Sequence, residues 1–87
     1  MLIINDKQGV RDYCWTNNIS IESFNQTVVI SDKVEDCSNM FMCCNSFNYS
    51  VNIPKSVKTC KGMFNCCISF NQTVIIPDSV KDCSEMF

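Results

Sequence analysis

The fold is decided by residues 47–69, FNYSVNIPKSVKTCKGMFNCCIS, because this stretch recurs on both of its sides at a constant interval of 23 residues. Residues 24–46 match it without a gap at 11 of 23 positions. Residues 70–87 match residues 24–41 at 13 of 18 positions. A period between about 20 and 50 residues is typical of chains whose repeats stack and share one continuous core. Residues 24–46, 47–69 and 70–87 are called here the first, second and third repeats, the third being incomplete.

A weaker copy precedes these three repeats. Residues 2–4 align with residues 28–30, and a short insertion follows. Residues 1–23 lack the Met-Phe and Cys-Cys pairs of the other copies and carry Trp15 in their place. Terminal copies of stacked arrays are atypical because one of their faces meets solvent. We therefore predict that residues 1–23 form a degenerate N-terminal capping repeat.

Each repeat has parts that can be predicted from residue type. Residues 26–30, 49–53 and 72–76 alternate in polarity and are rich in β-branched side chains, which is typical of short strands. Polar turns follow them. Apolar residues in the segment 37–44 and its equivalents recur at helical spacings, which predicts one or two tight helical turns. The predicted fold is a repeat solenoid, a short leucine-rich-repeat-like array with one parallel strand per repeat and short helical turns.

Charge and composition argue against several classes of function. The 7 basic and 9 acidic residues form no block of either sign, which argues against nucleic-acid binding and a polybasic membrane contact. No apolar run approaches the roughly 20 residues of a membrane span. Histidine and a glycine-rich phosphate loop are absent, so we predict neither an enzyme nor a cofactor. The N-terminal residues lack the features of a signal peptide, which favours an intracellular or virion-associated location over secretion.

The 8 cysteines leave three interpretations open. Reduced cysteines would fill small apolar positions of the core. Equivalent cysteines such as Cys37 and Cys60 would lie one strand spacing apart, within the ~4.4–6.8 Å between Cα atoms that a disulfide needs. A zinc site is the third interpretation, although the Cys-x5-Cys-Cys spacing is not that of a zinc finger. We favour buried thiols and predict no metal, because the repeat needs a small apolar residue at these positions.

Asn25, Asn48 and Asn71 each begin a sequence of the N-glycosylation form. That form has no use in a chain that is not exported. We predict instead that the three side-chain amides satisfy backbone groups where the chain enters each strand, and that they stack as a ladder.

The repeat as a whole resembles the BspA-like class of leucine-rich repeats and the related repeats of mycoplasma-type surface lipoproteins. The residues that carry the resemblance are Ser69-Phe70-Asn71, the Val-x-Ile-Pro-x-Ser-Val pattern of residues 74–80, and the Cys-x-x-Met-Phe pattern of residues 83–87. The resemblance covers residues 20–87 and implies a right-handed curved solenoid. In the family such repeats serve as adhesion, surface-display and protein-binding modules of bacteria, phages, large viruses and some protists.

Positions that differ between repeats, and the C-terminal end, are the expected contact surfaces. We predict that another protein, or further copies of this chain, contacts Gln26, Val29, Tyr49, Asn52, Gln72, Ile75, Met86 and Phe87. The leading hypothesis is a non-enzymatic protein-interaction or scaffold module, a small subunit of a larger assembly such as a phage or virus particle. The alternatives are a fragment of a bacterial or protist surface adhesin and a cysteine-based redox or metal-binding protein.

Overall fold

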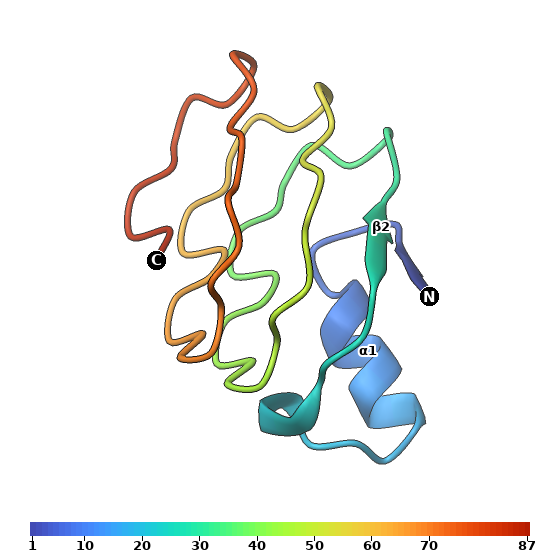
Figure 1. The fold of residues 1–87 in the computed structure, drawn as a ribbon. Coiled ribbons are helices and arrows are strands. Elements are labelled where there is room, and N and C mark those ends of the chain that lie inside the picture. The colour runs from blue at the N-terminus through green and yellow to red at the C-terminus, as the bar shows by residue number, and fades with distance from the viewer.

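The computed structural model describes residues 1–87 and has four short regular elements. They are strand β1 (Leu2–Ile4), helix α1 (Gly9–Thr16), the 3-10 turn η1 (Ile21–Ser23) and strand β2 (Val28–Ile30). β1 and β2 form a two-stranded parallel sheet (Figure 1). Its register pairs Leu2 with Val28 and Ile4 with Ile30, in agreement with the alignment of residues 2–4 on residues 28–30.

Helix α1 is an element that the repeat pattern does not predict. It occupies the insertion that follows β1, and its buried residues are Val10 and Cys14. Trp15 points away from the core and is 89% exposed. The aromatic residue that covers the first repeat is Tyr13, whose ring meets Phe24 edge-on at 6.0 Å between centroids. Tyr13 and Cys14 lie three and four residues after Val10, so these three share a helix face that Trp15 does not.

The predicted strands are confirmed only in part, for residues 28–30; residues 49–53 and 72–76 contain no strand. On this side of the molecule, neighbouring repeats contact each other through asparagine side chains. Asn48 N–H donates to Asn25 Oδ1 at 3.3 Å, and Asn71 N–H donates to Asn48 Oδ1 at 2.8 Å. The predicted asparagine ladder is thereby confirmed.

Backbone pairing between the repeats lies instead on the side that carries the Cys, Met and Phe positions. Isolated parallel bridges join Asp36 to Thr59 and Thr59 to Asp82. Figure 1 shows the successive turns of the chain side by side, with α1 at one end and the C-terminus at the other.

The predicted tight turns over residues 37–44 are confirmed only in part, because they are not helical. Tight turns occur there, with Met40 N–H donating to the Cys37 carbonyl at 3.2 Å and Cys44 N–H donating to the Phe41 carbonyl at 3.0 Å. They do not join into a helix because Asn39 (φ 57°) and Cys43 (φ 63°) are left-handed. The same conformation recurs at the equivalent positions of the later repeats, at Gly62, Cys66 and Glu85.

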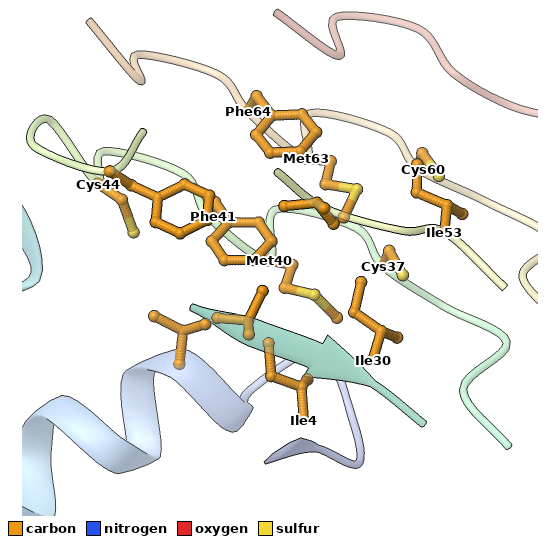
Figure 2. Packing of buried hydrophobic residues seen from close by; sticks show 14 of the residues in the cluster. Ile4, Ile30, Cys37, Met40, Phe41, Cys44, Ile53, Cys60, Met63 and Phe64 are labelled. Carbon is orange, nitrogen blue, oxygen red and sulfur yellow. The ribbon is translucent and has the colours of Figure 1, made fainter. Parts of the chain in front are cut away.

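The core is one cluster of 19 buried apolar side chains, and no charged or polar side chain is buried. The first and second repeats contribute nearly the same positions, so Met40 and Met63, like Cys37 and Cys60, come from successive turns of the chain (Figure 2). The third repeat contributes only Met86. The radius of gyration is 11.7 Å, close to the roughly 12 Å of a compact domain of this length.

A substitution at Gly62 tests the left-handed positions. A Cβ atom at Gly62 would overlap Asn39 Oδ1, and the φ of 62° is strained for any L side chain. We expect Gly62→Ala to lower the free energy of unfolding by about 1–2 kcal/mol, as measured by urea denaturation. Glu85→Gly, at the equivalent position of the third repeat, is the matched control and should raise this free energy by about 1 kcal/mol. Equal effects of both variants would contradict the assignment.

Candidate functional site

The hydrogen bonds between repeats run in one direction along the segments that follow each cysteine position. N–H groups of the first repeat donate to carbonyls of the second at 2.9 Å, in the pairs Cys37–Thr59, Asn39–Lys61, Phe41–Met63 and Cys43–Asn65. N–H groups of the second repeat donate to carbonyls of the third in the pairs Cys60–Asp82 (2.8 Å), Gly62–Ser84 (3.0 Å) and Phe64–Met86 (2.7 Å). Each repeat therefore has an edge of N–H donors on one side and an edge of carbonyls on the other.

Arg11 of α1 covers the carbonyl edge of the first repeat. Its guanidinium donates to the carbonyls of Asn39 (2.7 Å), Met40 (3.1 Å) and Met42 (2.9 Å). Met40 and Met42 are the counterparts of residues that accept hydrogen bonds in the second repeat. A planar guanidinium with several N–H donors suits a set of convergent carbonyls. Arg11 thus supplies the donors that a preceding repeat would supply.

Two rows of stacked phenylalanine rings cross the molecule toward the third repeat. Rings of Phe24, Phe47 and Phe70 follow one another at 5.8 and 5.9 Å between centroids. Rings of Phe41, Phe64 and Phe87 follow at 5.4 and 5.6 Å. Phe41 is fully buried and Phe64 is 2% exposed, whereas Phe87 is 69% exposed. Each row begins inside the protein and ends at its surface.

The third repeat exposes positions that the second repeat buries. We define this surface as the end face, made of Phe70, Val74, Ile76, Val80, Cys83 and Phe87. Exposure rises from 6% at Ile53 to 39% at its counterpart Ile76, and Cys60 is buried where Cys83 is exposed. An open apolar pocket of about 270 Å³ lies at this face, lined by Phe64, Cys66, Cys67, Ile68, Phe70 and Phe87. The end face is thus core surface left uncovered.

A second apolar surface lies on the sheet side of the molecule. We define it as the outer face, made of Ile3, Val29, Asn52 and Ile75, which share one repeat position. The three apolar members are 59%, 45% and 81% exposed in that order. Ile3 is absent from the predicted contact residues, although the alignment of residues 2–4 with residues 28–30 contains the signal that could have added it.

The other predicted contact residues have different surroundings. Tyr49 is exposed, and its ring lies 6.4 Å from that of Phe47. Gln26 and Gln72 are half-buried. The Gln72 amide donates to Asn48 Oδ1 at 3.0 Å and accepts from the Ser50 hydroxyl at 3.1 Å. Met86 is only 4% exposed, so its side chain lies beneath the surface.

All 8 cysteines are free thiols, and their positions follow the repeat. Cys14, Cys37, Cys44 and Cys60 are buried, as expected for core positions, whereas Cys66 and Cys83 are exposed. The hydrogen bond with Cys60, together with burial, raises the pKa of the Cys37 thiol. Burial raises the pKa of Cys44 to about 12 and that of Cys67 to about 11. Within the core these groups pack as neutral side chains.

No group of three or more cysteine or acidic side chains is placed to hold a metal ion. None of the helices has the length and apolar character of a transmembrane segment. Neither a family model, nor a curated protein, nor a solved structure matches this chain.

Removing Arg11 tests its role on the carbonyl edge. We expect Arg11→Met, which keeps much of the aliphatic stem, to lower the free energy of unfolding by about 2 kcal/mol, because charged hydrogen bonds to partly buried carbonyls are lost. Arg11→Lys should lower the free energy of unfolding by a smaller amount, since an ammonium group cannot reproduce the planar arrangement of guanidinium N–H donors. Urea denaturation measures both, and full recovery by lysine would contradict a geometric role for the guanidinium.

The buried thiols predict a loss of stability at alkaline pH. As pH rises above the ordinary cysteine pKa of 9.0, the unfolded chain loses the Cys44 proton while the folded chain, with its pKa of about 12, retains it. The free energy of unfolding should therefore fall as the pH rises from about 9 toward about 12 under reducing conditions. The fall should be shallower in Cys44→Ala. Identical slopes in urea denaturation series of both proteins would show that Cys44 does not contribute.

Proposed function

We propose that this chain is a non-catalytic protein-binding module built as a short repeat solenoid. Contacts between equivalent residues support the architecture. Asn25, Asn48 and Asn71 bond one to the next across 23 residues. Phenylalanine rings and cysteine thiols that are 23 residues apart in the sequence also contact each other. Parallel bridges from Asp36 through Thr59 to Asp82 give successive repeats one common direction. The sequence pattern that resembles BspA-like repeats supports the same architecture.

The observation that carries the functional proposal is the end face. The ring of Phe64 packs between two other rings of its row, whereas the ring of Phe87 is covered on one side only, by Phe64 at 5.6 Å between centroids. Phe87 is 69% exposed. Covering a side chain of this size stabilises a complex by about 1.5–3 kcal/mol. Apolar surface gathered in one place marks protein-binding sites, whereas scattered apolar residues do not. The end face gathers such residues beside an apolar pocket.

The outer face gives the proposed module a second contact surface. Ile3, Val29 and Ile75 form its apolar part, and Asn52 interrupts it. Because these residues project from a shared repeat position, a partner lying across the repeats would meet them in sequence. Two surfaces on one small protein fit a subunit that joins larger components, for which a phage or virus particle is the proposed setting.

Phe87→Ser tests the end face as a protein-binding surface. We expect the wild-type chain to associate as its concentration rises, because the apolar end face is exposed, and Phe87→Ser to weaken this association at least about tenfold. Light scattering and sedimentation measure the mass. Trp15→Ser is the matched control, since Trp15 is 89% exposed at a distance from the end face. A monomeric wild-type chain at every concentration, or an equal effect of both variants, would contradict the proposal.

A further inference from the structure

Backbone groups of the third repeat point away from the second repeat without partners. In the second repeat, the N–H groups that donate to the next repeat belong to Cys60, Gly62 and Phe64. Their counterparts have no acceptor within the chain, and these are Cys83, Glu85 and Phe87. A protein group that covers the apolar side chains of this face would also remove water from these donors. Such donors then need acceptors, because a buried N–H without one costs about 1–3 kcal/mol.

Unpaired acceptors flank these donors. Lys81 N–H donates to the Lys58 carbonyl at 2.7 Å, and the carbonyl of Lys81 is free. Ser69 N–H donates to the Asn45 carbonyl at 3.1 Å, and the counterpart of Asn45 is Ile68, whose carbonyl is also free. Asn48 Oδ1 accepts from Asn71 N–H at 2.8 Å, and Asn71 Oδ1 accepts nothing. The free groups of the third repeat, together with the Ile68 carbonyl at the end of the second, thus match the groups through which each earlier repeat binds the next.

The apolar side chains of the end face also continue the repeat pattern. Phe70 and Phe87 end the two rows of rings, which have spacings of 5.4–5.9 Å between centroids inside the protein. A pair of phenylalanine rings in the same relative positions would continue both rows. The same ligand would then satisfy the donors, the acceptors and the ring faces.

We infer that the end face selects one occupant, a further turn of this same repeat laid down in the same orientation. This inference rests on the proposed function and names the partner of that surface. The carbonyls of such a turn, at the positions of Asp82, Ser84 and Met86, accept from the unpaired N–H groups. Its two phenylalanine rings cover Phe70 and Phe87.

A second copy of this chain does not offer the same complement. Two end faces in symmetric contact bring the N–H row of Cys83, Glu85 and Phe87 against an identical row, so donors meet donors. The carbonyl edge of the first repeat is the complementary surface, but Arg11 occupies it at Met40 and Met42. Association of the chain with itself through the end face therefore uses apolar contacts at the exposed ring of Phe87 and leaves the N–H groups unpaired and in contact with water.

Amide hydrogen exchange separates these occupants. The extended variant is residues 1–87 followed directly by a second copy of residues 65–87, and it is kept reduced. We expect the amides of Cys83, Glu85 and Phe87 to exchange freely in the original chain, also at concentrations where it associates. In the extended variant they should exchange about a hundredfold more slowly, approaching the amides of Cys60, Gly62 and Phe64. An extension of the same length and composition in scrambled order is the matched control and should give no protection.

Each other outcome has a definite meaning. Protection of the three amides in the associated original chain would make a second copy the occupant, which overturns the inference and leaves the proposed protein-binding function standing. Equal exchange in the original and extended chains, or equal protection by the scrambled extension, would overturn the selection of a repeat turn. Protection by the extension alone, with a wild-type chain that never associates, would uphold the inference and contradict the association expected under the proposed function.

Discussion

One-way hydrogen bonding between the backbones of residues 37–43 and their counterparts in the later repeats is the interaction on which the rest of the structure depends. Inside each repeat, tight turns use the carbonyls of Cys37 and Phe41 for the N–H groups of Met40 and Cys44. What remains for the neighbours is a row of N–H groups on one side and a row of carbonyls on the other. Left-handed residues at Asn39 and its counterparts prevent these turns from closing into a helix, in which each carbonyl would be used internally.

Stacking in this way gives equivalent side chains equivalent surroundings, and the core follows from it. Successive phenylalanine rings stack on one another and Cys37 forms a hydrogen bond with Cys60, so the protein interior is filled with very little regular secondary structure. The cysteines belong to this packing. Their burial raises the pKa of Cys44 and Cys67, which keeps these thiols neutral and poorly nucleophilic at neutral pH.

Directional bonding also makes the two ends of the array chemically different. The carbonyl edge is covered by Arg11 and the aromatic row by Tyr13, both from α1. The opposite end keeps its donors and the exposed ring of Phe87. A surface of this kind combines apolar area, which favours binding, with hydrogen-bonding groups in a fixed order, which choose the partner. The proposed binding function rests on this combination.

The repeat pattern predicted the period, the core positions and the asparagine ladder, since side chains that recur at a constant spacing need the same environment in each repeat. It also placed Val29, Tyr49, Ile75 and Phe87 at the surface. The edge of each repeat that carries the backbone pairing could not be predicted from this pattern. That depends on left-handed backbone at positions where the residues are Asn39, Gly62 and Glu85, which share no side-chain type. Helix α1 and the three bonds of Arg11 were equally beyond prediction, because they occur in the one copy that departs from the repeat and join residues distant in sequence.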